Sequence, residues 1–271
     1  MRILLDAGHG EHDFGAVGPT GLREKDANLQ VVLALGRRLR QAGLEVLYTR
    51  TEDRFLPLDE RATRARSVDL FLSIHHNATA QGRPPVNRME VYLPPVADGP
   101  AWVLGQALLD TFREAGDWPF PPVPEPWPST YRVLRWPQLV GALTEAAYIS
   151  DPEGETFLRS RRNLEREAEL LAQGVLRFLD FYPEGIPRVH RLRRDRRSQD
   201  LLFVDLKGPF APETLTATWG PYVLPLIDVE GHTAILAIPE DLPAGEHPLT
   251  IRGWTPPGYP SLPFETPLRV E

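Results

Sequence analysis

The first two thirds of the chain alternate short apolar runs with longer segments of helical periodicity. Residues 26–42 and 163–182 carry apolar side chains at spacings of three and four, which predicts amphipathic helices. Alternation of this kind restricts the fold to the α/β class, with helices flanking a mostly parallel sheet. The apolar runs, each typical of a strand, are residues 2–7, 44–49, 68–74, 89–93 and 139–149.

The composition of the chain changes after Tyr182. Residues 184–198 are rich in arginine and lack apolar periodicity, which predicts a solvated linker. Short runs separated by Gly and Pro over residues 199–271 predict a small β-sandwich of immunoglobulin-like type. We therefore expect two domains, residues 1–183 and 199–271, of which the first folds on its own.

Charge and cysteine content narrow the function classes. The formal net charge is -7, so nucleic acid is not an expected partner. The absence of cysteine excludes thiolate ligands and leaves His, Asp and Glu as candidate metal ligands. The opening residues MRILLDAGHG do not resemble a signal peptide, and no stretch approaches the roughly 20 apolar residues of a membrane span.

Histidines follow two of the predicted strands. His9 follows the first strand in DAGHG, and His75 and His76 follow the third in SIHHN. The carboxyl ends of neighbouring parallel strands meet at one edge of a sheet, which brings such rings within roughly 5 Å of one another. Glu24 lies just before the first predicted helix and supplies a carboxylate. Two histidines and one glutamate form the ligand set of hydrolytic zinc sites.

Each of these residues also has a structural interpretation. A lone histidine after a strand is commonly a hydrogen-bonded loop residue, and Glu24 in a first helical turn favours the helix dipole. Adjacent imidazoles at the end of an apolar strand are harder to explain without a function. Spacing alone therefore leaves both the metal site and the structural interpretation open.

Five ordered motifs resemble those of one protein family. LLDAGHGEHDFGAVG, GLREKDANL, VDLFLSIHHNA, MEVYL and LTEAAYISDPEGE resemble the zinc-dependent N-acetylmuramoyl-L-alanine amidases, a family of bacterial cell-wall hydrolases that includes the cell-separation amidases. The resemblance covers about residues 2–181 and leaves out the C-terminal β region. It implies an enzyme that hydrolyses the amide between N-acetylmuramic acid and L-alanine in peptidoglycan.

The resemblance also implies roles for single residues. It places the zinc ligands at His9, Glu24 and His75, and the catalytic base at Glu145. Without the resemblance, Glu145 is equally an acid at a strand end that pairs with an arginine. His76 stands where the family commonly has a small residue, so it is a candidate to compete with His75, to support the ligands or to contact substrate.

Asp6 and Asn77 are two further candidates near the predicted site. Asp6 is a candidate to orient His9, or else a polar residue that ends the strand. Asn77 is a candidate to support the ligands or contact substrate, or else it caps the following turn.

Three functions are compatible with these observations. The leading one is a zinc amidase that acts on peptidoglycan. The second is a non-catalytic or weakly catalytic peptidoglycan-binding module, and the third is an intracellular amidohydrolase that acts on soluble muropeptides. The substrate implies the cell envelope, in the periplasm or wall, whereas the missing signal peptide favours the cytoplasm. We expect the β domain to contact the wall or a regulator.

Overall fold

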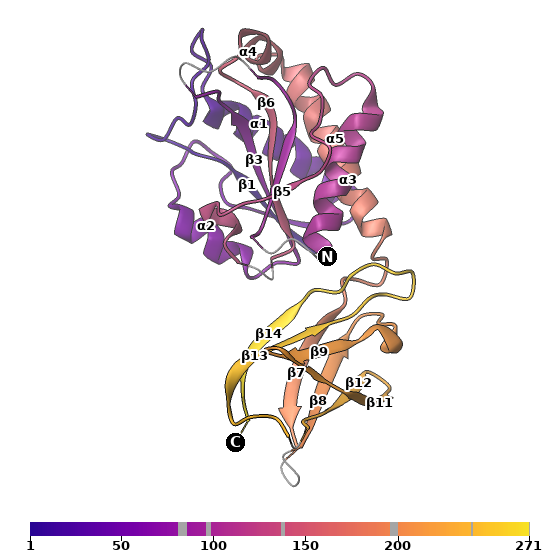
Figure 1. Ribbon diagram of the computed structural model, residues 1–271. Helices are drawn as coiled ribbons and strands as arrows, with labels where there is room; N and C mark the ends of the chain where they lie inside the picture. The colour runs from indigo at the N-terminus through magenta and orange to yellow at the C-terminus, as the bar shows by residue number, and fades with distance from the viewer. Residues whose placement is uncertain (81–85, 96–98, 137–138, 196–199, 240, 271) are drawn as a thin grey trace. The chain divides into compact units, whose positions relative to one another are not determined.

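The computed structural model describes residues 1–80, 86–95, 99–136, 139–195, 200–239 and 241–270 (Figure 1). The chain divides into two compact units. Unit 1 comprises residues 1–97 and 101–180, and unit 2 comprises residues 98–100 and 181–271. The division falls between residues 180 and 181, where the sequence predicted a domain end at residue 183.

A six-stranded mixed sheet forms the centre of unit 1, with the strand order β2-β1-β3-β6-β4-β5. The first four of these strands are parallel, whereas β4 runs antiparallel to β6 and β5 runs parallel to β4. Each of the five predicted strands overlaps an observed one. The bounds are β1 Arg2–Ala7, β2 Glu45–Tyr48, β3 Leu70–Asn77, β4 Glu90–Leu93, β5 Trp127–Pro128 and β6 Gly141–Tyr148.

Helices flank this sheet, so the predicted α/β class is confirmed (Figure 1). Helix α1 packs along α5, and α2 packs against the short 3-10 helix η1. None of the helices in the described ranges is both long and apolar enough to span a membrane. The bounds are α1 Glu24–Gln41, α2 Leu58–Ala65, α3 Pro100–Ala115, η1 Arg132–Leu134, α4 Pro152–Leu158 and α5 Arg161–Asp180.

Helix α1 begins at Glu24 and ends just before Gly43. The helix carries acidic residues in its first turn and basic residues in its last, as the helix dipole favours. It ends before Gly43, whose φ of 89° lies in the left-handed region that glycine adopts easily. The first residue of the helix, Glu24, lies two residues before the start that the periodicity predicted.

Unit 2 consists of two four-stranded sheets, ordered β10-β9-β13-β14 and β11-β12-β8-β7. Both sheets contribute to one apolar core. At its centre Trp219 is fully buried and donates a hydrogen bond from Nε1 to the Leu268 carbonyl, at 2.7 Å. The bounds are β7 Arg188–Arg194, β8 Leu201–Lys207, β9 Thr216–Trp219, β10 Tyr222–Leu224, β11 Leu226–Glu230, β12 Thr233–Ala237, β13 Gly245–Arg252 and β14 Phe264–Val270.

The prediction of a linker over residues 184–198 is wrong in its central part. Strand β7 occupies this segment and pairs antiparallel with β8. Val189 and Leu192 pack against the core, whereas Arg193 pairs with Asp205 at 2.7 Å. A shift in register between Val189 and Arg191 breaks the regular alternation, which hides the strand in the sequence. Residues 196–199, which include the end of the predicted linker and the start of the predicted β domain, lie outside the described residues.

We predict that Trp219→Ala destabilises unit 2 selectively. The substitution removes a large buried side chain and a hydrogen bond, so the free energy of unfolding of unit 2 should fall by about 3–5 kcal/mol. Scanning calorimetry should show a lower transition for unit 2 and an unchanged transition for unit 1. Val223→Ala, at a side chain that is 69% exposed, is the matched control. An equal shift of both transitions would contradict the division into two units.

Candidate metal centre

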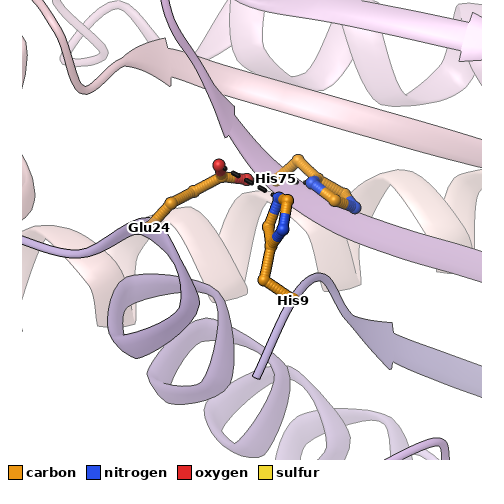
Figure 2. A group of neighbouring side chains, drawn as sticks. All are labelled: His9, Glu24 and His75. Atoms are coloured by element: carbon orange, nitrogen blue, oxygen red, sulfur yellow. Dashed lines mark hydrogen bonds and ion pairs between the residues drawn. The ribbon is translucent and has the colours of Figure 1, made fainter. Parts of the chain in front are cut away.

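His9, Glu24 and His75 converge at one edge of the sheet in unit 1 (Figure 2). His9 follows β1, Glu24 begins α1 and His75 lies on β3. His9 Nε2 lies 3.1 Å from Glu24 Oε2, and His75 Nδ1 lies 2.8 Å from Glu24 Oε1. One candidate ligand atom from each residue lies within 4.8 Å of the others. The structure thus brings the three predicted ligands together.

This donor set fits a zinc ion. Imidazole nitrogen and carboxylate oxygen are common zinc donors, and three protein ligands leave a coordination position open. The glycines beside the site leave room for the rings. A Cβ atom on Gly8 would lie 2.2 Å from the His75 ring, and one on Gly15 would lie 2.4 Å from Glu24 Oε2. The backbone therefore approaches the ligands more closely than a side chain permits.

The carboxylate of Glu24 is fixed from several sides. Its Oε2 accepts a hydrogen bond from the Ala16 amide at 2.9 Å. Its Oε1 accepts hydrogen bonds from Asn28 Nδ2 at 3.2 Å and from the His76 amide at 3.3 Å. Burial raises the pKa of Glu24, but hydrogen bonds and charge from His75 and His9 outweigh it, so this pKa lies well below its usual value. Glu24 is therefore ionised, as a metal ligand must be.

Asp13 orients the His9 ring. Its Oδ1 lies 2.9 Å from His9 Nδ1 and accepts the hydrogen there, which leaves Nε2 free toward Glu24. Burial lowers the pKa of His9, but hydrogen bonds and charge from Glu24 and Asp13 outweigh it and raise this pKa above its usual value. The sequence analysis missed Asp13. Its only signal is an acidic residue four positions after His9, inside the first motif.

Two buried arginines hold the turn that carries His9. His9 adopts a left-handed backbone with φ 63°, which costs energy for a residue other than glycine. Arg61 donates hydrogen bonds to the carbonyl oxygens of Ala7 and His9, both at 2.7 Å. Arg50 donates to the Gly8 carbonyl at 2.9 Å. These bonds fix three successive carbonyl groups and stabilise the strained turn.

Asp6 supports His9 through Arg61. Arg61 Nη1 lies 2.7 Å from Asp6 Oδ1, and the remaining hydrogen bonds to the carboxylate come from Thr49 and Ser73. Burial raises the pKa of Asp6, but the Arg61 charge and the two hydroxyl groups outweigh it, so this pKa lies below its usual value. Asp6, a candidate to orient His9, thus acts on it through Arg61, whereas Asp13 contacts the ring directly.

His76 lies on the opposite face of the sheet from His75. Strand β3 continues to Asn77, and neighbouring residues of a strand face opposite sides. His76 is 1% exposed, with Nδ1 2.8 Å from Asn28 Oδ1 and Nε2 3.0 Å from Glu167 Oε2. The prediction that His76 competes with His75 or contacts substrate is therefore wrong.

Glu145 lies beside His75 on the same face of the sheet. The register of β6 pairs it with His75 of β3 on one side and with Glu90 of β4 on the other. Its Oε2 is buried and has no hydrogen-bond partner among the described residues. Burial first, and then the charges of Glu24 and Glu90, raise the pKa of Glu145 well above its usual value. The alternative pairing with an arginine is not observed in the described part of the chain.

Glu90 is a second acidic residue that the sequence analysis missed. It is fully buried, and its carboxylate accepts hydrogen bonds from Asn77 Nδ2 at 2.8 Å, the Tyr92 hydroxyl at 2.9 Å and the Tyr148 hydroxyl at 2.7 Å. Asn77 Oδ1 accepts from the Ala78 amide, as expected of a residue that caps a turn. Asn77 thus supports Glu90, next to Glu145. In the sequence, the signal for Glu90 was an acidic residue inside the apolar run MEVYL.

Comparison with known proteins identifies relatives of unit 1. The family model described as N-acetylmuramoyl-L-alanine amidase matches residues 3–177. The chain is 28% identical over 221 residues to N-acetylmuramoyl-L-alanine amidase AmiC of Neisseria meningitidis, a match that spans 66% of this chain and 52% of that protein. It is 30% identical over 187 residues to the YqiI protein of Bacillus subtilis, spanning 66% of this chain and 84% of that protein. The chain thus covers about half the length of the AmiC relative.

Solved structures show the same likeness. N-acetylmuramoyl-L-alanine amidase AmiC2 of Nostoc punctiforme superposes with a TM-score of 0.60 at 30% identity, covering 66% of this chain and 97% of that one. The catalytic domain of CwlV, an N-acetylmuramoyl-L-alanine amidase of Paenibacillus polymyxa, superposes with a TM-score of 0.59 at 30% identity. The match covers 66% of this chain and 98% of the CwlV chain. Residues 181–271 lie outside the matched family model.

We predict that His75→Ala loses zinc. Because one of three ligands is removed, the metal content after gel filtration should fall from about one ion per chain to a small fraction of that value. Elemental analysis by mass spectrometry measures this content. His12→Ala, at an exposed histidine of the same loop as His9, is the matched control and should keep the ion. Retention of zinc by His75→Ala would remove His75 from the ligand set.

We predict that Arg61→Met destabilises the metal-free protein by about 3–5 kcal/mol near pH 7, because Asp6 stays buried without its cation. The difference in the free energy of unfolding between wild type and variant should narrow toward about pH 4.5. In the variant, Asp6 takes up a proton more readily as the pH falls, which relieves the cost of its buried charge. In the wild type, the stabilisation by the Asp6–Arg61 pair persists until the pH drops through the lowered pKa of Asp6. Urea titrations measure both values, with Arg64→Met, an exposed arginine of the same helix, as control. A deficit independent of pH would contradict the role of the ion pair.

Proposed function

This chain belongs to the N-acetylmuramoyl-L-alanine amidase family, and on that premise we propose that it is a zinc-dependent hydrolase of the amide between N-acetylmuramic acid and L-alanine in peptidoglycan. The observation that carries the proposal is the convergence of His9, Glu24 and His75 beside Glu145. A metal-ligand set next to a buried, unpaired carboxyl group is an arrangement suited to metal-assisted amide hydrolysis.

The three ligands prepare the site for the reaction. His9 Nε2, His75 Nδ1 and the ionised carboxylate of Glu24 face a common point and would hold the ion there. A zinc ion bound at this point acidifies water and polarises the carbonyl oxygen of a bound amide. Asp13 and Glu24 fix the orientation of the His9 ring, so little rearrangement is needed on binding.

Glu145 moves the proton. In the proposed reaction its carboxylate accepts a proton from the attacking water, whose oxygen forms the new bond to the carbonyl carbon of the lactyl group. The carbon–nitrogen bond then breaks, and Glu145 passes the proton to the departing nitrogen of L-alanine. Glu145 Oε2, which has no hydrogen-bond partner among the described residues, is available to hold the proton between the two steps.

Aromatic side chains border Glu145 on the β4 side. The Tyr92 ring packs edge-on against Trp127 at 5.7 Å and against Tyr131 at 5.0 Å between ring centroids. Tyr131 is 42% exposed, and burial together with the charge of Glu145 raises its pKa. We infer that these three aromatic side chains contact substrate, because they offer apolar ring faces and hydroxyl groups to a sugar–peptide junction.

The remaining parts of the proposal concern unit 2 and the cell compartment. We propose that the two sheets of unit 2 form an immunoglobulin-like sandwich that contacts the wall polymer or a regulator. The support is its separate core, which leaves it free to serve a second binding event. A peptidoglycan substrate implies action at the cell envelope.

We predict that Glu145→Gln keeps zinc and fold and lowers the rate of amide hydrolysis by about a hundred- to ten-thousand-fold, because the group that moves the proton is lost. Release of amino-terminal L-alanine from a soluble muropeptide measures the rate. Glu153→Gln, at an exposed acid of α4, is the matched control. A near wild-type rate for Glu145→Gln would make Glu145 structural.

Intact sacculi and soluble muropeptides, tested in parallel, separate the three candidate functions. An amidase of the wall cleaves both substrates. Cleavage of muropeptides alone supports an intracellular enzyme, and binding to sacculi without cleavage of either substrate supports a binding module.

A further inference from the structure

A buried histidine–glutamate pair lies on the face of β3 opposite the metal centre. His76 of β3 is 1% exposed and Glu167 of α5 is fully buried, and His76 Nε2 lies 3.0 Å from Glu167 Oε2. The other carboxylate oxygen of Glu167 has no hydrogen-bond partner among the described residues. Burying such a pair rarely adds stability, and an unpaired oxygen makes it more costly. A function other than stability is therefore expected of the pair.

The pair connects to the metal centre through Asn28 of α1. His76 Nδ1 lies 2.8 Å from Asn28 Oδ1. Asn28 Nδ2 donates to Glu24 Oε1 at 3.2 Å and to the Gly8 carbonyl at 3.3 Å. A continuous series of hydrogen bonds therefore runs from Glu167 through His76 and Asn28 to the ligand Glu24. We call these three supporting residues the relay.

The direction of each hydrogen bond in the relay is determined by its neighbours. The amide nitrogen of Asn28 must face Glu24 and Gly8, because both present acceptors. Asn28 Oδ1 therefore faces His76, whose Nδ1 must carry a hydrogen to donate. Glu167 Oε2, 3.0 Å from Nε2, holds the other side of the ring, so that Nδ1 stays turned toward Asn28.

Without Glu167, the Nε2 side of the His76 ring loses its partner, and the ring is free to turn Nδ1 away from Asn28. Asn28 Oδ1 then loses its own partner, and the amide group is free to turn around. That turn presents Asn28 Oδ1 to the carboxylate of Glu24, and two acceptors repel one another. Loss of the relay therefore misplaces the oxygen of Glu24 that faces His75.

We propose that Glu167 and His76 are positioning residues that orient Asn28, so that its amide group holds Glu24 Oε1 in place for metal binding. The inference rests on the proposed role of Glu24 as a metal ligand. It goes further by assigning a function to a buried pair that neither touches substrate nor ligates metal.

The test is the zinc affinity of the double variant H76L/E167L, measured by competition with a chelator. Leucine at both positions fills the space of the buried pair with apolar groups, which such sites commonly tolerate. We expect the zinc dissociation constant to rise about 10- to 100-fold, the usual effect of losing a residue that supports a ligand. An unchanged dissociation constant in a folded double variant overturns the proposal.

Two further variants separate positioning from packing. Glu167→Gln should bind zinc like wild type, because the glutamine amide donates to His76 Nε2 and leaves the hydrogen on Nδ1. Leu171→Ala, at a buried residue of the same helix outside the relay, should lower the melting temperature and leave zinc affinity unchanged. If Leu171→Ala weakens zinc binding as much as H76L/E167L does, the effect is one of packing and the proposal fails.

Asn28→Ala tests the relay even if the double variant does not fold. It removes the group that touches Glu24 and leaves the His76–Glu167 pair intact, so zinc affinity should fall by a similar factor. When Asn28→Ala is combined with H76L/E167L, zinc affinity should fall little further than in H76L/E167L, because the relay is already interrupted. Unaltered affinity in Asn28→Ala overturns the proposal. A wild-type protein that binds no zinc, or binds it without His75, contradicts instead the proposed function.

Discussion

The buried carboxylate of Glu24 is the point on which the whole site depends. Both imidazoles face it, the Ala16 amide reaches it from the loop before α1, and Asn28 reaches it from one turn further along the helix. Its negative charge is buried, and hydrogen bonds together with the charge of the two histidines offset the cost. A bound divalent ion would take over the charge of the histidines, which bind metal in their neutral form.

The surroundings of the ligands follow from the same requirement. His9 reaches Glu24 only because its backbone is left-handed, and that conformation depends on the buried arginine Arg61 and its partner Asp6. On the other side of the sheet, Asn28 needs a fixed amide orientation, which His76 and its partner supply. A buried ion pair on one side of the ligands and a buried histidine–glutamate pair on the other thus cost stability locally and hold the site in one arrangement.

Much of the fold was predictable from local patterns. Apolar runs and helical periodicity identified the five principal strands and the two longest helices of unit 1, because each pattern reflects one buried face. Strand β7 was missed, since a shift in register interrupts its alternation and its arginines face solvent. Helix α4 was also missed, because it has only seven residues and depends on the Asp151 side chain at its amino-terminal end.

The candidate ligands were predictable, and their supports only in part, since Asp6, His76 and Asn77 were named as candidates and Asp13, Arg61 and Glu167 were not. His9, Glu24 and His75 stand at element ends inside recognisable motifs, so their convergence was expected. Asp13, Arg61 and the relay act through contacts whose geometry appears only once the chain is folded. Competition of His76 with His75 was wrongly considered because β3 was expected to end at Ile74, whereas it continues to Asn77 and turns the second imidazole into the core.

The most direct test of the central claim is hydrolysis of a defined muropeptide in water enriched in oxygen-18, with the products analysed by mass spectrometry. The account predicts that zinc-loaded protein releases a peptide with a free amino group on L-alanine, and that one oxygen-18 atom enters the lactyl carboxylate of N-acetylmuramic acid. Label in any other carboxyl group, a new amino terminus at another residue, or an intact substrate would contradict it.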